Sequence, residues 1–196
     1  SWREAIGQRP VWLAASTREG EEELVLTAWR KLAVPHALLV LVPRHPQRFG
    51  AVAELLAREK ISFGRRSEGL PGSETQVWLG DSMGEMAAYF TLADVAFIGG
   101  SLLPLGGQNL IEAAACGCPS VVGPHTFNFL QATADAIAAG AALRVDDADG
   151  LAAAIGRVFG DSGELGAMRA AALSFAAAHR GATERTVALI RSALTS

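Results

Sequence analysis

The feature that most constrains the fold is a regular alternation of short apolar segments with longer segments of helical periodicity. The run Leu38–Val42 is continuous and apolar, as expected for a strand that is covered on both faces. In Glu21–Leu32 the apolar side chains recur at helical spacing, which gives this segment one stripe that faces a core. This alternation predicts right-handed crossovers and a doubly wound parallel sheet, so the fold class is α/β and Rossmann-like.

The predicted strands are Val11–Ala15, Ala37–Val42, Ile61–Phe63, Gln76–Leu79, Val95–Ile98, Ser120–Val122 and Ala142–Val145. The predicted helices are Glu21–Leu32, Arg48–Arg58, Met83–Leu92, Leu110–Cys116, Phe129–Ala139, Ala148–Phe159 and a final pair, Glu164–Ala178 and Thr183–Leu194. The final pair has no strand to connect, so it covers the sheet or reaches toward another domain. No domain boundary or internal repeat is visible, so residues 1–196 are expected to form one domain.

Composition excludes several broad classes of protein. Hydrophobic residues make up 50% and charged residues 19% of the chain, which is typical of a globular protein and not of a disordered one. The net charge is −3 and there is no basic run, which argues against a general nucleic-acid binder. The most apolar stretch, Ala87–Gly100, contains Asp94 and is too short to cross a bilayer, and no signal peptide is visible.

Two further features concern the compartment and the extent of the chain. Cys116 and Cys118 lie one residue apart, a poor spacing for a disulfide or a zinc knuckle. We therefore expect a reducing compartment, with both thiols acting as small apolar filler. The chain begins at Ser1 and not at Met, so we expect a fragment or a processed product.

Common catalytic and cofactor motifs are missing from the sequence. The first predicted strand is followed by Ser16–Gly20, which is not the glycine-rich dinucleotide fingerprint, and no phosphate loop ends in Gly-Lys-Ser/Thr. There is no Gly-x-Ser-x-Gly elbow. The four histidines show no paired metal-ligand spacing; they are His36, His45, His125 and His179. Dehydrogenase, NTPase, hydrolase and metalloenzyme functions all lose support.

Ligands of such sheets bind at the carboxyl ends of the strands, and four loops there are candidates. In Pro43-Arg44-His45-Pro46 the guanidinium of Arg44 offers a planar fork to a phosphate or carboxylate, although a solvated surface turn explains this tetrapeptide equally well. In Gly123–Phe129, His125 and Asn128 either face a ligand or, in the case of His125, bond only to the backbone.

The loop Gly80–Glu85 admits two interpretations. Ser82 and Glu85 have the spacing of a capping box, which predicts the start of a helix. That interpretation does not explain Gly84, because glycine costs a helix about 1 kcal/mol relative to Ala. Close approach of a ligand or of backbone explains Gly84 better, so a functional turn is favoured.

The most informative segment leads from the strand Val95–Ile98 into a helix that begins near Asn109. Two glycine pairs, Gly99–Gly100 and Gly106–Gly107, lie in this loop. Free backbone N–H groups at the helix start, together with the helix dipole, form an anion site. Glu112, one turn further, would repel a phosphate but accept hydrogen bonds from ribose hydroxyls. The alternative is that Asn109 and Glu112 only cap the helix. Four glycines before one helix disfavour this purely structural explanation, so we expect a ligand here.

Together these segments resemble the C-terminal half of the 3-deoxy-D-manno-octulosonic acid (Kdo) transferases of lipopolysaccharide synthesis. The resemblance keeps its order and spacing over roughly residues 11–145. The stretches that carry it are Ala15–Glu22, Leu41–Phe49, Leu79–Glu85, Ala93–Leu102, Gly106–Asn109 and Gly123–Phe129.

The resemblance implies a GT-B glycosyltransferase whose active site lies between two Rossmann-like halves, with this chain as the half that binds the donor, CMP-Kdo. The implied donor contacts are Pro43, Arg44, Met83, Gly84, Glu85, Asn109, Leu110, Ile111 and Glu112. No cofactor and no metal are implied. The N-terminal half, which is absent from this chain, is expected to hold the lipid A precursor, the catalytic base and the membrane association at the cytoplasmic face of the bacterial inner membrane. The fragment alone is therefore expected to be inactive.

The chain departs from the family at two positions, because many members carry His where this chain has Arg18 and Gln108. Gln108 cannot titrate, so we expect it to bind rather than to act as an acid or base. Two other functions stay open. One is another GT-B protein, such as a UDP-sugar transferase or epimerase, since these share the helix-start glycines and a ribose-binding Glu. The other is a non-catalytic binding module on a Rossmann-like scaffold, since the chain holds no complete catalytic set.

Overall fold

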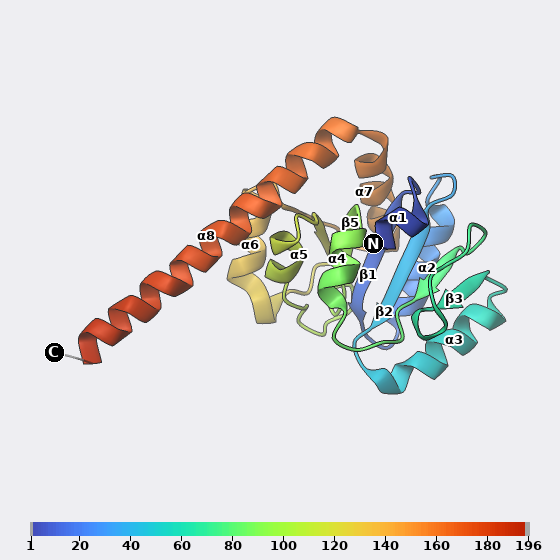
Figure 1. Cartoon of the computed structure of the whole chain (residues 1–196), viewed down its shortest axis with the longest axis horizontal. Helices are drawn as coiled ribbons and strands as arrows, with labels where there is room; N and C mark the ends of the chain where they lie inside the picture. Colours follow the sequence, from blue (N-terminus) through green and yellow to red (C-terminus); the bar gives the residue numbers. More distant parts are fainter. Residues whose placement is uncertain (1, 195–196) are drawn as a thin grey trace.

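Seven strands form a single sheet in the order β3-β4-β2-β1-β5-β6-β7 (Figure 1). The computed structural model describes the backbone of residues 2–194 and the side chains of residues 2–180. Every neighbouring pair of strands is parallel, which confirms the predicted doubly wound sheet. The strands are β1 (Val11–Thr17), β2 (Leu38–Pro43), β3 (Phe63–Arg65), β4 (Val77–Leu79), β5 (Val95–Ile98), β6 (Ser120–Val122) and β7 (Ala142–Arg144).

Helices cover both faces of the sheet (Figure 1). They are α1 (Trp2–Ile6), α2 (Glu21–Lys31), α3 (Phe49–Arg58), α4 (Met86–Leu92), α5 (Ile111–Ala115), α6 (Leu130–Ala138), α7 (Ala148–Gly160) and α8 (Ser162–Leu194). Short 3₁₀ turns span Pro46–Arg48, Arg66–Glu68 and Phe127–Phe129. Among the described residues, no helix combines the length and the apolarity needed to cross a membrane.

Each face of the sheet carries its own hydrophobic core, because side chains alternate along a strand. In β2, Leu38 and Val40 belong to the core under α1, α4, α5, α6 and α8, whereas Leu39 and Leu41 belong to the core under α2, α3 and α7. All four side chains are fully buried. This two-sided burial explains why the sequence of β2 is a continuous apolar run.

The polar residue in the apolar stretch before β5 is a structural clamp. Asp94 is 7% exposed and accepts hydrogen bonds from the backbone N–H of Val11 at 2.8 Å and from Arg169 of α8 at 2.5 Å. The guanidinium of Arg3 also reaches both Asp94 oxygens, at 3.2 and 3.3 Å. One carboxylate thus joins the amino-terminal segment, β1 and α8 at the amino ends of the strands.

The structure corrects three details of the predicted elements. The last two predicted helices are one continuous helix, α8, because Gly181 weakens a helix but keeps the N–H that a proline would remove. The helix α1 was not predicted, since Trp2–Ile6 is too short to show a helical period. Strand β3 lies at Phe63–Arg65, two residues beyond the predicted start.

The cysteines behave largely as expected of apolar filler. Cys118 is 1% exposed in the core, and burial raises the pKa of its thiol. Cys116 is a free thiol of intermediate exposure that packs against the same core.

Candidate functional site

The carboxyl ends of β2, β4 and β5 bring the predicted site residues to one edge of the sheet. Pro43 is the last residue of β2 and Arg44 follows it, while Met83–Glu85 lie between β4 and α4. Asn109 and Leu110 lead into α5, whose first turn holds Ile111 and Glu112. The order of the sheet places β1 between β2 and β5, where the direction of winding reverses. Crevices for ligands form at such a reversal point.

Arg44 is held by its backbone and exposes its side chain. Its N–H donates to the carbonyl of Thr17 at 2.9 Å, so β1 fixes the position of the residue. The guanidinium and the neighbouring His45 are exposed on the same edge. A cation with a fixed backbone and an exposed fork is suited to an anionic ligand.

The turn Met83–Glu85 is not a capping box. Helix α4 begins only at Met86, and the side chain of Glu85, at the N-cap position, makes no capping hydrogen bond. Gly84 has a φ of +78°, and a Cβ placed on it would meet no atom within 4 Å. The glycine is therefore explained by its left-handed backbone and not by close packing, and the space above it is open.

Two hydrogen bonds brace this turn against neighbouring elements. The Ser82 hydroxyl lies 3.0 Å from the Tyr89 hydroxyl, and Arg66 donates to Glu85 at 2.8 Å. A hydrogen bond from Ser82, and then the charge and hydrogen bond of Arg66, lower the pKa of Glu85. Burial raises the pKa of Tyr89 to about 12, so its hydroxyl stays protonated at neutral pH.

Arg66 is a residue of this site that the sequence did not reveal. It follows β3, and its guanidinium carbon lies 5.0 Å from the centre of the Trp2 ring. Nothing in the local pattern Arg65-Arg66 distinguishes it from a solvated charge pair. Its role is visible only when β3 and β4 are paired, because that pairing sets the turn after β3 beside the turn after β4.

Packing and backbone conformation account for the two glycine pairs of the loop after β5. A Cβ on Gly99 would lie 2.4 Å from the carbonyl oxygen of Ser16, and a Cβ on Gly106 would lie 2.1 Å from the Asn128 side-chain nitrogen. Gly100 and Gly107 both have positive φ, +71° and +77°. Both close approaches are thus to protein atoms, so these glycines are explained without the ligand that was expected from the sequence.

The start of α5 has features of a helix cap and features of a ligand site, the two interpretations that the sequence left open. The Asn109 side-chain oxygen accepts from the N–H of Ile111 at 3.0 Å, so Asn109 does act as a local cap. Glu112 lies exposed in the first turn. Since α5 has only five residues, its dipole is small, and any anion binding here depends on individual N–H groups and side chains.

Glu21 is a second residue that the sequence analysis missed. It is fully buried at the start of α2, and its carboxylate accepts hydrogen bonds from the backbone N–H groups of Arg18, Gly100, Ser101 and Leu102. Acidic residues in a first helical turn are ordinarily explained by the helix dipole, which hides this role. The available signal was Gly20, which has a φ of +86° and lets α2 begin directly above the end of β1.

The next residue, Glu22, forms a separate buried ion pair. It is fully buried, accepts from the Thr17 hydroxyl at 3.1 Å and pairs with Arg48 at 3.0 Å. Burial raises the pKa of Glu22, although Arg48 and Thr17 oppose this shift. The pair ties the turn before α3 to the end of β1, beside Arg44.

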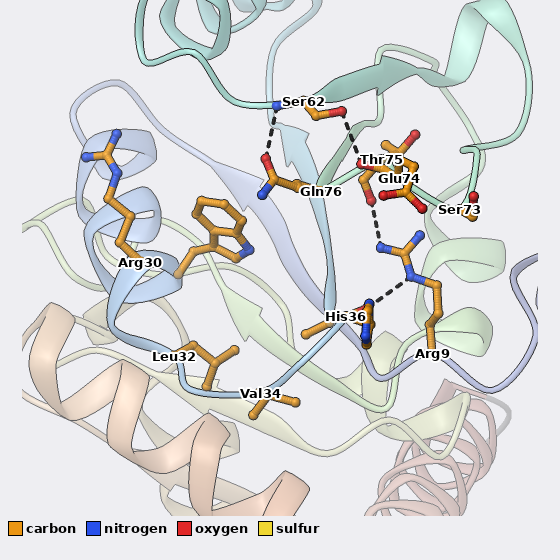
Figure 2. A pocket seen from close by; sticks show the side chains of 12 residues that line it. Arg9, Arg30, Leu32, Val34, His36, Ser62, Ser73, Glu74, Thr75 and Gln76 are labelled. Atoms are coloured by element: carbon orange, nitrogen blue, oxygen red, sulfur yellow. Dashed lines mark hydrogen bonds between the residues drawn. The ribbon is translucent and has the colours of Figure 1, made fainter.

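A pocket of about 700 Å³ lies at the opposite edge of the sheet (Figure 2). Its walls come from the last turn of α2 and from the residues that precede β1, β2, β3 and β4, so it is distant from the predicted donor contacts. Arg9 donates to the carbonyl oxygens of His36, Gly72 and Thr75, at 3.0, 3.2 and 2.6 Å. Because its side chain joins three loops, Arg9 acts as a brace of the pocket wall. The part of the chain that the structure describes shows no group of three His, Cys, Asp or Glu side chains arranged for a metal ion.

Two curated relatives are Kdo transferases. The 3-deoxy-D-manno-octulosonic acid transferase of Bordetella pertussis is 48% identical over 194 residues, which cover 95% of this chain and 45% of the relative. The enzyme of the same name from Haemophilus influenzae is 52% identical over 124 residues, which cover 62% of this chain and 29% of the relative. This chain thus spans less than half the length of these relatives. No family model matches it.

Solved structures place the fold among glycosyltransferase C-terminal domains. The C-terminal CMP-Kdo binding domain of WaaA from Acinetobacter baumannii is 33% identical, with a TM-score of 0.81 over 87% of this chain and 91% of that chain. The C-terminal domain of the glycosyltransferase LpcC from Francisella tularensis is 15% identical, with a TM-score of 0.64 over 90% of this chain and 89% of that one, which shows the fold alone. The chain belongs to the 3-deoxy-D-manno-octulosonic acid transferase family, as a C-terminal domain of the GT-B type.

Proposed function

We propose that this chain is the donor-binding half of a glycosyltransferase that moves Kdo from CMP-Kdo to a lipid A precursor. The observation that carries the proposal is the likeness to the CMP-Kdo binding domain of WaaA, at 33% identity over 87% of this chain. The position of the predicted donor contacts at one edge of the sheet supports it. Residues 1–196 act as one donor domain, and the acceptor is held by a separate N-terminal half.

The donor contacts divide by chemistry. The N–H groups and amide around Asn109 and Leu110 bind the phosphate, and Ile111 lies in the same short turn. Glu112 accepts from the ribose hydroxyls, while Met83, Gly84 and Glu85 face the nucleotide. Met83 is 62% exposed, so it offers a large apolar surface to a base or sugar. Pro43 ends β2 and sets the backbone from which Arg44 approaches the negative charge of the donor.

The reaction needs a nucleophile, a base and stabilisation of the leaving group. A sugar hydroxyl of the acceptor attacks the anomeric carbon of Kdo, the bond from that carbon to the phosphate oxygen breaks, and CMP departs with the electron pair. Arg44 and the N–H groups near Asn109 stabilise the departing phosphate by charge and hydrogen bonds, without need of a metal. The hydroxyl proton passes to a base in the N-terminal half. This chain alone is therefore inactive, and membrane association at the cytoplasmic face of the inner membrane comes from the other half.

Calorimetric titration with CMP, using UMP and AMP as controls, tests the donor site directly. We expect CMP to bind more tightly than UMP and AMP. Asn109→Ala should lower the affinity for CMP by about tenfold or more, because hydrogen bonds to an anion are lost. Gln131→Ala is the matched control, since Gln131 is an amide on the exposed side of α6 that bonds to Asp135 at 2.8 Å. A preference for UMP would favour a UDP-sugar enzyme instead.

A second experiment separates an enzyme from a binding module. Adding the native N-terminal half should restore Kdo transfer, and Asn109→Ala and Glu112→Ala should each lower it. If both variants transferred Kdo at the wild-type rate, the assigned donor site would be wrong. If no transfer occurred after the two halves were joined, the non-catalytic module would be the better account.

A further inference from the structure

The loop that leads to the predicted phosphate contacts is fixed by a carboxylate from another element. We propose that Glu21 is a positioning residue for donor binding: it sets the conformation of the loop Gly99–Asn109 and thereby the affinity for the nucleotide. This inference rests on the proposed function of this edge as the donor site. Glu21 itself is buried and does not need to touch the donor.

Both oxygens of Glu21 are fully engaged. One oxygen accepts from the N–H of Gly100 at 2.6 Å and of Arg18 at 2.9 Å. The other accepts from the N–H of Ser101 at 3.0 Å and of Leu102 at 3.1 Å. A carboxylate offers about four lone-pair sites, so these four donors use its capacity. The side chain is therefore structural in its contacts and has no lone pair left for chemistry.

The geometry of the loop requires an anion at this position. The N–H groups of three consecutive residues, Gly100–Leu102, converge on one point, and such a nest attracts negative charge. The point lies at the carboxyl ends of β1 and β5, where sheets of this kind often bind a ligand. Here Glu21 occupies it, which leaves the ligand to bind further along the loop.

A short path of hydrogen bonds connects Glu21 to the predicted phosphate contact. Gly100 donates its N–H to Glu21 and accepts, through its carbonyl, the N–H of Gly107 at 2.6 Å. Gly107 precedes Asn109 by two residues. The hydrogen bond between Gly107 and Gly100 thus joins the two ends of the loop at the residue that Glu21 holds. Asn109 follows this bonded pair in the chain.

The same anchor reaches the loop after β6. The Ser101 hydroxyl accepts the N–H of Gly123 at 2.8 Å, and the Ser101 carbonyl accepts the N–H of His125 at 3.0 Å. Ser101 is fully buried and donates its own N–H to Glu21. Release of Glu21 would therefore loosen both loops at this edge of the sheet, with little effect on the core below.

The test compares Glu21→Gln with Asp94→Asn. Asp94 is also a buried carboxylate that accepts a backbone N–H, but it acts at the opposite end of β5. In Glu21→Gln the amide group points its hydrogens at two N–H donors. We therefore expect this variant to lower the affinity for CMP by about tenfold. The amide resonances of residues 100–102 and 107–109 should shift in the same variant. Asp94→Asn should lower the melting temperature but keep the CMP affinity within about twofold.

The outcomes distinguish this inference from the proposed function. If the wild-type chain and Asp94→Asn bind CMP and Asn109→Ala does not, yet Glu21→Gln binds as the wild type does, the positioning role is overturned and the donor site stands. If the wild-type chain shows no affinity for CMP, the proposed function and the inference fall together. Equal loss of affinity in Asp94→Asn would also overturn the inference, since general destabilisation would then explain the result.

Two further measurements apply if Glu21→Gln does not fold. Glu21→Asp keeps the charge but is one methylene too short to hold all four donors, and it should also weaken CMP by about tenfold. In the wild-type chain, the amides of residues 100–102 should exchange with solvent about a hundredfold more slowly than those of the exposed residues 72–74. Equal exchange rates in the two loops, or full CMP affinity in Glu21→Asp, would contradict the proposed role.

Discussion

Arg66 donates a hydrogen bond to Glu85 at 2.8 Å and so joins the turn after β3 to the turn that precedes α4. The same guanidinium lies over the ring of Trp2, at 5.0 Å, which adds the amino-terminal helix to the assembly. The turn that it supports contains Met83 and Gly84, two of the proposed donor contacts. A charge that is not itself a proposed donor contact thus supports the backbone of the contacts.

Replacing Arg66 with Met should weaken the donor site without unfolding the protein. The substitution removes the hydrogen bond to Glu85 but keeps an apolar chain beside Trp2. We expect CMP affinity to fall by about fivefold, the size of one lost charge-assisted hydrogen bond in a partly exposed position. Arg58→Met, on the exposed side of α3, is the control. Calorimetric titration of both variants with CMP measures the two affinities. Equal affinities would show that the turn Met83–Glu85 does not depend on the hydrogen bond from Arg66.

The same pair predicts a pH dependence of stability. Because Ser82 and then Arg66 lower the pKa of Glu85 in the folded chain, the ionised carboxylate stabilises the fold above the unfolded pKa, which is about 4.3. This stabilisation is lost as the pH falls through the folded pKa. The difference in unfolding free energy between wild type and Arg66→Met should therefore be largest near pH 7 and shrink below about pH 4. Urea unfolding at several pH values measures it, and a difference that grows toward acid would refute the assignment.

The buried pair Glu22–Arg48 should respond unequally to removal of its two members. Arg48→Met leaves a fully buried carboxylate without its cation, which should cost about 3 kcal/mol. Glu22→Gln removes the buried charge and keeps an acceptor for Thr17, and should cost about 1 kcal/mol. Denaturant unfolding of both variants at pH 7 compares the two free energies.

A pH series checks the sign of this effect. Burial raises the pKa of Glu22, and loss of Arg48 should raise it further. A raised folded pKa means that the folded chain takes up a proton before the unfolded chain does, so stability is recovered as the pH falls toward about 4.3. The deficit of Arg48→Met should therefore shrink between pH 7 and pH 5. That of Glu22→Gln should grow slightly as the pH falls, because the wild type gains stability from protonation of Glu22 and the Gln variant cannot. If the loss of unfolding free energy in Arg48→Met did not change with pH, burial would not disfavour the ionised form of Glu22 in that variant.

The fold was predictable because its signals are local. Continuous apolar runs such as β2 and the helical stripe of α2 are visible within about ten residues each, and their alternation fixes the class of the sheet. What the sequence could not define were short elements and exact ends. The helix α1 holds only five residues, and the start of α4 at Met86 depends on the contacts of Ser82 and Glu85 with Tyr89 and Arg66.

The candidate site was predictable only in part, because some of its residues act on loops that are distant in sequence. Residues such as Arg44 and Asn109 stand at strand ends, where the topology alone points to a ligand. Glu21 and Arg66 act on loops that are 79 and 19 residues away in sequence, and no local pattern carries that information. The glycines after β5 were noticed from the sequence but attributed to a ligand, because the carbonyl of Ser16 that approaches Gly99 belongs to another strand.

Two glycine-to-alanine substitutions should therefore differ sharply in cost. A Cβ on Gly99 would lie 2.4 Å from the carbonyl oxygen of Ser16, and backbone on both sides cannot yield as a flexible side chain would. Ser16 itself has a φ of +57° at a bulge in β1, so its carbonyl is already fixed by the pairing of β1 with β2 and β5. We expect Gly99→Ala to cost about 3 kcal/mol, as overpacked sites do. A Cβ on Gly84 would lie in open space, so Gly84→Ala should lower the free energy of unfolding only through its positive φ, by about 1 kcal/mol. Unfolding both variants in urea ranks them, and equal costs would mean that the loop after β5 moves away from β1 freely, which the anchoring by Glu21 forbids.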